Sequence, residues 1–361
     1  MVKRGIAPHL LRNRVDTIII CHLELKREIS KVESRVKMRI ILAPMQGVVD
    51  HPMREMLTRL GGYDRCVTEF IRVTQTHLPE KVFFRYCPEL KQGGKTLAGT
   101  PVYIQFLGGN PRLLADNAVI ATQLGAAGID LNFGCPAKVV NRHDGGSVLL
   151  KEPTRVAAIV RAVREAVDPA VPVTAKIRLG FQDASLLLDI AGGVEAAGAS
   201  ELCIHARTRE DGYKPPAYWQ HINVVRQQLT IPVVVNGEIW TPQDAMQAQL
   251  ESGCADVMLG RGALACPDLA RAIKQQHQGQ RPQFMSWLTV LEELADFFET
   301  SDQPDPKYIG NRTKQWLSYL KNQYAGAELL FERIKRLRTV PDILDAMEQH
   351  RRHDLNNELS G

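Results

Sequence analysis

The chain has 361 residues, of which 44% are hydrophobic and 24% are charged, as in an ordinary globular protein with one large domain and a smaller one. This composition excludes a disordered, collagen-like or coiled-coil chain, and no apolar run reaches the ~18 residues that a membrane-spanning helix needs. Seven cysteines without a CxxC pair argue against a disulfide framework or a zinc ribbon and favour a cytoplasmic protein.

The formal net charge of +5 is confined to residues 1–37, which hold nine bases and four acids, whereas the rest of the chain has 36 of each sign. Net charge therefore says nothing about the partner of the folded part. A buried-strand pattern begins directly after Met38. We expect 1–37 to be a non-native or disordered leader, with Met38 as the working initiator. A functional basic arm that binds nucleic acid is the alternative.

From residue 38 onward, short apolar runs alternate with amphipathic helical patterns. The runs are 40–43, 66–70, 102–107, 129–133, 173–177, 202–206, 233–235 and 257–259, and the clearest helical patterns are 111–124, 154–167, 186–197 and 242–251. Eight such units over about 240 residues predict an α/β fold, a (β/α)8 TIM barrel. An open doubly wound sheet is the alternative, but no GxGxxG follows the first run.

The pattern changes after about residue 275. Residues 277–282 are typical of a linker, and no strand pattern follows them. The segments 287–300, 311–325, 327–337 and 342–350 are typical of helices. We therefore predict a barrel domain over 38–277, a small helical-bundle domain over 283–350 and a flexible tail over 351–361.

In a (β/α)8 barrel the chemistry sits at the carboxyl ends of the strands. Lys176 and Arg178 are two apart on one strand and so share a face, where two buried cations need an anion. His205 and Arg207 repeat the arrangement on the next strand, and Gly237 with Gly260 lets backbone N–H groups approach a ligand. This combination predicts a phosphate-bearing cofactor, although a charged barrel rim is the plainer alternative.

Cys135 is the reactive candidate, because it follows a strand end and precedes a glycine-containing loop, 138–148, that could act as a lid. A thiol there can serve as a general acid or as a nucleophile. A buried structural cysteine is the alternative, as we expect for Cys203. No cluster of His, Cys and Asp has metal-ligand spacing, so no metal is predicted.

The segments APM at 43–45, LNFGCPAK at 131–138, KIRLG at 176–180 and VNGEI at 235–239 resemble the tRNA-dihydrouridine synthases. The likeness extends from residue 38 to about residue 343. Within that family, RTKQWLSYL at 312–320 resembles the C-type bacterial subfamily.

The resemblance implies FMN as cofactor, NADPH (or NADH) as reductant, and reduction of the C5–C6 bond of a uridine in the tRNA D-loop, at position 16. It implies that Cys135 donates the proton to C5 while reduced FMN gives a hydride to C6. The implied FMN contacts are Pro44, Met45, Gln46, Gln105, Lys176, His205, Asn236, Gly237, Glu238, Gly260 and Arg261. The implied contacts to the target base and the RNA are Arg72, Asn132, Arg178, Arg312, Lys314, Tyr319 and Lys335.

The segment 307–338 carries eight bases and two acids, which predicts a basic patch for tRNA. On a helix, Trp316, Leu317, Leu320 and Tyr324 should pack inward, and Arg312, Lys314 and Tyr319 should lie on the outer side. A solvated charged face is the alternative. We expect a monomer without a membrane partner. The rival functions are an FMN barrel acting on a free small molecule, such as a dihydroorotate-type dehydrogenase, and a tRNA-binding protein whose flavin is vestigial.

Overall fold

The computed structural model describes residues 38–300 and 306–360. Its strands are β1 (Ile40–Leu42), β2 (Arg65–Val67), β3 (Ile71–Arg72), β4 (Val102–Leu107), β5 (Ile129–Asn132), β6 (Val173–Arg178), β7 (Glu201–His205), β8 (Val233–Asn236) and β9 (Asp256–Leu259). The named strands pair only in parallel, in the order β2-β1-β9-β8-β7-β6-β5-β4-β3, and a further β2–β4 pairing closes the ring. The predicted (β/α)8 barrel is therefore confirmed.

The second predicted strand, 66–70, is strand only at 66–67, the end of β2, and β3 begins just after the predicted run. Both β2 and β3 pair with β4 and together form one stave of the barrel. Between them, the Thr68 N–H still donates to the Tyr103 carbonyl at 3.0 Å, and two side chains take part as well. The Thr68 hydroxyl accepts from the Gln105 backbone N–H at 3.0 Å, and the Phe70 N–H donates to the Gln46 side chain at 3.1 Å. The break in the strand thus ties its carboxyl end to the neighbouring loops.

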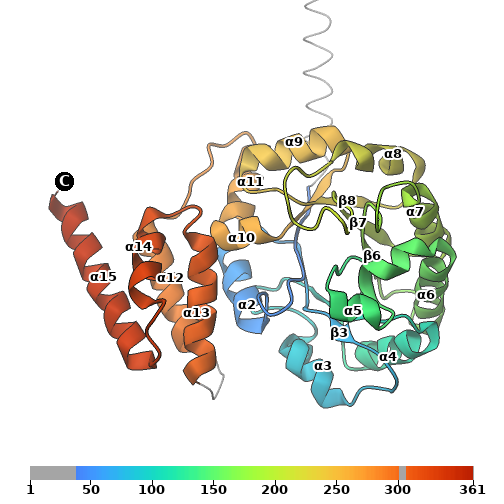
Figure 1. Cartoon of the computed structure of the whole chain (residues 1–361), viewed down its shortest axis with the longest axis horizontal. Helices are drawn as coiled ribbons and strands as arrows, with labels where there is room; N and C mark the ends of the chain where they lie inside the picture. Colours follow the sequence, from blue (N-terminus) through green and yellow to red (C-terminus); the bar gives the residue numbers. More distant parts are fainter. Residues whose placement is uncertain (1–37, 301–305, 361) are drawn as a thin grey trace, which may run out of the picture. The chain divides into compact units, whose positions relative to one another are not determined.

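Helices surround the strands, and α4, α6, α7, α8 and α9 follow one another around them in Figure 1. The barrel helices are α2 (His51–Leu60), α3 (Glu80–Tyr86), α4 (Pro111–Gln123), α5 (Lys138–Arg142), α6 (Pro153–Ala166), α7 (Leu187–Ala196), α8 (Gln220–Gln228), α9 (Pro242–Ser252), α10 (Arg261–Ala265) and α11 (Leu269–His277), with short 3₁₀ helices η1 (Pro88–Gln92) and η2 (Gly146–Lys151). Proline opens α4, α6 and α9, and the predicted stop at Gly253 has the left-handed backbone that ends α9.

Part of the barrel interior is apolar. Ile41, Ala43, Val67, Cys203, Val234 and Met258 form one buried cluster. At the amino ends of the strands, Glu201 pairs with Arg39 and Arg65. This packed interior leaves the carboxyl ends of the strands as the place for a ligand.

Four helices follow the barrel: α12 (Trp287–Thr300), α13 (Pro306–Leu320), α14 (Ala325–Ile334) and α15 (Val340–Ser360). All four were predicted, but α13 ends five residues early, where the Asn322 side chain donates to the Tyr319 carbonyl at 2.9 Å. The last predicted helix was too short, because α15 continues to Ser360 and Glu348 pairs with Arg351 and Arg352 one turn later. The flexibility of 351–361 stays a prediction.

The leader, 1–37, lies outside the described residues. The inward stripe of α13 is confirmed, since Trp316, Leu317 and Leu320 are buried. Among the residues that the structure describes, no helix combines the length and the apolar character that crossing a membrane requires.

Candidate active site

A cavity of about 660 Å³ opens at the carboxyl ends of the barrel strands, a volume in the usual range for a ligand pocket. It is lined by every residue predicted to contact the cofactor: Pro44, Met45, Gln46, Gln105, Lys176, His205, Asn236, Gly237, Glu238, Gly260 and Arg261. Cys135, Asn132, Arg178 and Tyr319 line the same cavity. The tertiary structure therefore brings together groups from eight staves and from helix α13.

Lys176 offers an ammonium group at the floor of the cavity. Its Nζ donates to the Asn236 Oδ1 at 3.0 Å, and the Asn236 amide nitrogen donates in turn to the Met258 carbonyl at 2.8 Å. Burial lowers the pKa of Lys176. The amide of Asn236 is thus fixed with its oxygen toward the lysine.

His205 is not the cation that the sequence allowed. Burial, followed by the charges of Arg178, Lys176 and other arginines, holds the pKa of His205 well below its ordinary value, so its imidazole is neutral. Gly237 adjoins this ring with φ of 116°, and a Cβ at Gly237 would lie 2.8 Å from the His205 Cδ2. Only glycine fits there.

Glu238 organises the arginines beside the cavity. Its carboxylate pairs with Arg261 at 2.6 Å and with Arg207 at 2.9 Å, and it accepts from the Trp240 indole N–H at 3.1 Å. Arg207 was expected at the cavity mouth, but it is fully buried and does not line the cavity. The reason is its engagement by Glu238 and by the Pro216 carbonyl, which its Nε contacts at 3.1 Å.

Cys135 differs from the other described cysteines, which are all buried, because it is only half-buried and lines the cavity. Burial raises the pKa of its thiol against the opposing effect of an Ala137 backbone hydrogen bond and the charge of Arg178. The thiol is therefore protonated at neutral pH, as an acid must be. The 138–148 loop is tied to this residue, since Ser147 N–H and the Asn141 amide both donate to the Cys135 carbonyl, at 3.1 and 2.9 Å.

Arg178 holds two loops at the cavity wall. It donates to the Gly134 carbonyl at 2.7 Å and to the Thr208 and Gly212 carbonyls at 2.9 Å each. Its guanidinium also lies 5.1 Å from the ring centre of Tyr213. Burial lowers the pKa of Arg178.

Sequence reasoning missed Tyr213 and Trp240, which both line the cavity. Tyr213 is 54% exposed, and the Arg261 guanidinium lies 5.5 Å from its ring centre and 5.1 Å from that of Trp240. Tyr213 follows β7 and Trp240 follows β8, at the carboxyl ends of the strands. That position alone was a signal, because loops there carry function.

Arg312 does not lie on the outer side of α13 as predicted. It is buried, with Nε donating to the Asp50 carboxylate at 3.0 Å and Nη1 donating to the Gly47 carbonyl at 3.1 Å. Positions four apart are only about 40° apart on a helix, so Arg312 faces the barrel with Trp316. The Trp316 indole donates to the Leu264 carbonyl of α10 at 3.1 Å. Helix α13 is therefore fixed to the segments that follow the neighbouring strands β1 and β9.

The other predicted RNA contacts are dispersed. Tyr319 lines the cavity, while Lys314 is half-buried and donates to the Leu337 carbonyl. Lys335 is exposed and pairs with Glu332. Arg72 is half-buried on β3 and does not line the cavity.

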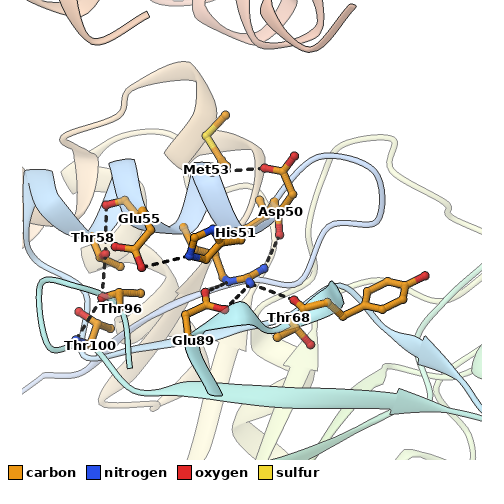
Figure 2. Close-up of polar contacts among 12 residues, drawn as sticks. Asp50, His51, Met53, Glu55, Thr58, Thr68, Glu89, Thr96 and Thr100 are labelled. Atoms are coloured by element: carbon orange, nitrogen blue, oxygen red, sulfur yellow. Dashed lines mark hydrogen bonds and ion pairs between the residues drawn. The ribbon is translucent and has the colours of Figure 1, made fainter. Parts of the chain in front are cut away.

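One group in the described part of the chain has metal-ligand geometry, although the sequence suggested none. Figure 2 shows His51, Glu55 and Glu89 grouped together. Their candidate ligand atoms lie within 4.8 Å of one another. However, both Glu89 oxygens accept from the buried Arg54, at 2.8 and 2.9 Å. A dication there would face this guanidinium, so we interpret the group as an ion-pair cluster.

Comparison with known proteins places these residues in a family. Residues 41–350 match the model described as dihydrouridine synthase. The tRNA-dihydrouridine(16) synthase of Shewanella oneidensis is 49% identical over 88% of this chain and 99% of its own length. The enzyme of the same name from Neisseria meningitidis serogroup B is 43% identical over 89% of this chain and 97% of its own length.

Solved structures show the fold at low identity. A histamine dehydrogenase from Rhizobium sp. 4-9 aligns with a TM-score of 0.51 and 16% identity, over 75% of this chain and 50% of that one. A 2-naphthoyl-CoA reductase aligns with the same TM-score and 13% identity, over 67% of this chain and 50% of that one. This chain thus spans half the length of each, and the likeness concerns the barrel fold alone.

Proposed function

The chain belongs to the dihydrouridine synthase family, and we propose that it reduces the C5–C6 double bond of uridine at position 16 of the tRNA D-loop, with FMN as cofactor and NADPH as reductant. The observation that most directly supports this proposal is that Cys135 lines one cavity with Lys176 and Asn236. A flavin site without an acid, or an acid without a flavin site, would not suffice for the reaction.

The residues present fit a flavin mononucleotide. Gly237 and Gly260 both line the cavity and carry no side chain, so a ligand can approach their backbone closely. Arg261, held by Glu238, supplies the neighbouring positive charge. Lys176, Gln105 and Met45 would then hold the ring, and reduced flavin, when bound, supplies the hydride for C6 of the uracil.

The chain's own part in the reaction is to orient the base, to stabilise charge and to deliver a proton. Negative charge develops on the uracil as C6 is reduced, and Lys176 and Arg178 provide nearby cations. The Cys135 thiol, kept neutral by burial, donates its proton to C5. The positive charge of Arg178 favours the thiolate that remains. The uridine must leave its stack to enter the cavity.

Exposed basic side chains near the end of α14 support tRNA as the partner. Arg333, Lys335, Arg336 and Arg338 are exposed there, and Tyr319 of α13 reaches the cavity. Such a group suits phosphate contacts, with the tyrosine ring available for stacking. We further propose that the protein acts as a monomer in the cytoplasm.

The proposal is tested by mapping dihydrouridine position by position in tRNA from a strain that lacks this gene. We expect loss confined to position 16, restored by the wild-type chain and not by C135A. Loss at position 17 or 20 alone would overturn the assignment of the position. Unchanged tRNA, together with reduction of free uracil compounds by the purified protein, would favour the small-molecule flavin enzyme instead. Rapid mixing with NADPH and NADH distinguishes the two reductants by the rate of flavin bleaching.

A further inference from the structure

A buried carboxylate that the proposed mechanism does not use lies beneath the cavity. Asp130 on β5 is 2% exposed and is paired in register with Gln105 on β4 and Thr174 on β6. It precedes Asn132 by two residues, so both side chains point to the same face of β5, with Asp130 one layer deeper in the barrel. A charged group at this depth requires an explanation.

Asp130 ends a continuous chain of hydrogen bonds that starts at the catalytic loop. The backbone N–H groups of Gly134 and Cys135 both donate to the Asn132 Oδ1 at 3.0 Å. The Asn132 amide nitrogen donates to the Gln105 Oε1 at 2.7 Å, and the Gln105 amide nitrogen donates to the Asp130 Oδ2 at 2.7 Å. The Thr174 hydroxyl donates to the other Asp130 oxygen at 2.5 Å.

The two ends of this chain fix the orientation of both amides between them. A backbone N–H can only donate, so Asn132 must present its oxygen to the Cys135 loop and its nitrogen to Gln105. A carboxylate can only accept, so Gln105 must present its nitrogen to Asp130. If the Gln105 amide were turned over, its oxygen would face the Asp130 carboxylate and its nitrogen would face the Asn132 nitrogen. Turning the Asn132 amide over would likewise break its hydrogen bonds at both ends. In a buried site such unmade hydrogen bonds are costly.

The charge state of Asp130 suits this role. Burial raises its pKa to about 6, against the stabilising hydrogen bonds from Gln105 and Thr174 and the charges of Arg65 and Lys176. At neutral pH the group is therefore ionised and accepts only. Gln105 lines the cavity, and its amide nitrogen has a second hydrogen besides the one that it donates to Asp130.

We propose that Asp130 is a positioning residue that sets the direction of this hydrogen-bond chain. Through the chain it fixes the position of the Cys135 loop relative to the Gln105 side chain in the cavity wall. This inference rests on the proposed function, because it joins the acid to the pocket that would hold the flavin ring. Asp130 contacts neither, and it acts through Gln105 and Asn132. Misplacement of reacting groups by about 1 Å can cost ~100-fold in rate, so the effect of losing this residue is measurable.

The experiment compares D130L and D130N in the flavin-bound enzyme. Leucine fills the space but accepts no hydrogen bond, so the Gln105 amide loses its fixed partner. Asparagine keeps an oxygen for Gln105 and removes only the charge. A matched control is D256L, which replaces another buried barrel carboxylate, one whose partner is Arg39 and which does not line the cavity. If D130L does not fold, D130S replaces it, since a serine hydroxyl is too short to reach Gln105.

Two readouts are used. The first needs no tRNA: the rate at which iodoacetamide alkylates Cys135, followed on its own peptide by mass spectrometry. The second is the rate at which tRNA reoxidises the reduced flavin, measured together with tRNA affinity. We expect D130L to change the alkylation rate at least ~3-fold and to slow flavin reoxidation ~10- to 100-fold with tRNA affinity within twofold, and D130N to lie within ~3-fold of wild type in both.

The inference is overturned if D130L equals D256L in both readouts, or if D130N is as impaired as D130L. These results are distinguishable from failure of the proposed function. A wild-type protein that binds no flavin and forms no dihydrouridine would refute the function, while the alkylation rates would still report whether Asp130 positions the Cys135 loop.

Discussion

The sequence and the structure disagree most sharply about Arg312, and substitution by methionine tests which is right. The sequence suggests a phosphate contact on the outer side of α13, whereas the structure makes the guanidinium an anchor for the loop after β1. In R312M, methionine retains the apolar stem and removes the charge and every donor. The Gly47 and Val48 carbonyls lose their donor, and the Asp50 carboxylate loses its ion pair.

The expected loss follows from this burial. The Arg312 side chain is 6% exposed and that of Asp50 is 17% exposed, so the pair is little screened by solvent. Breaking a buried pair by removing one partner costs about 3–5 kcal/mol in the free energy of unfolding. Pro44, Met45 and Gln46 belong to the same loop and line the cavity. We therefore also expect flavin to bind about tenfold more weakly, which corresponds to about 1.4 kcal/mol.

The assays are urea unfolding, a flavin titration followed by fluorescence, and tRNA binding at two salt concentrations. The matched control is K321M, which removes an exposed cation at the end of the same helix and should change stability by less than about 0.5 kcal/mol. R312M should keep tRNA affinity when saturated with flavin. The reasoning is refuted if R312M is as stable as K321M and binds flavin normally but loses tRNA affinity and part of its salt dependence, since that is the behaviour of a phosphate contact.

Three further changes test the site. C135A should slow dihydrouridine formation by roughly 100- to 10,000-fold with flavin binding unchanged. Because burial raises the pKa of the Cys135 thiol, the wild-type rate should decline only at pH above the ordinary thiol range. A decline at neutral pH would contradict the assignment of Cys135 as the acid. G237A should lower flavin content, because the φ of Gly237 is 116° and an added Cβ would meet His205 at 2.8 Å. G192A should not, because an added Cβ at Gly192 has nothing within 4 Å. Equal flavin content in both variants would count against the cavity as the flavin site. The pKa of Asp130 rises from 3.8 unfolded to about 6 folded, so between these values the folded chain retains a proton that the unfolded chain releases. Wild-type stability should therefore fall by about 3 kcal/mol more than that of D130N between about pH 3 and 7, and parallel profiles in urea would show that the carboxylate is not buried as described.

The barrel was predictable from the sequence because its signals are local. Each strand is a short apolar run, each helix repeats its apolar face every three to four residues, and prolines and glycines mark the ends, as at Pro242 and Gly253. The order of strands then follows from the parallel fold itself. The cavity-lining positions were also predictable, because a barrel brings the carboxyl ends of all its strands to one rim.

The helical part was predictable in type but not in its limits. The chain turns after Leu320, where the Asn322 side chain meets a helix-end carbonyl, and α15 continues through Arg351 and Arg352 because Glu348 pairs with both. Short polar side chains and surface ion pairs decide such ends by a few tenths of a kcal/mol, which composition does not resolve.

The sequence by itself determined that this chain folds as a parallel barrel, that one cysteine stands at a strand end, and which motifs it shares with a known family. Only the tertiary structure decided that Arg312 is an anchor and that Asp130 directs the amides beneath the cavity. The physical reason is that a charge or an amide acquires its role from partners far away in sequence: Asp50 for Arg312, and Gln105 for Asp130. Periodicity describes which way a side chain points, but only packing determines what it meets there.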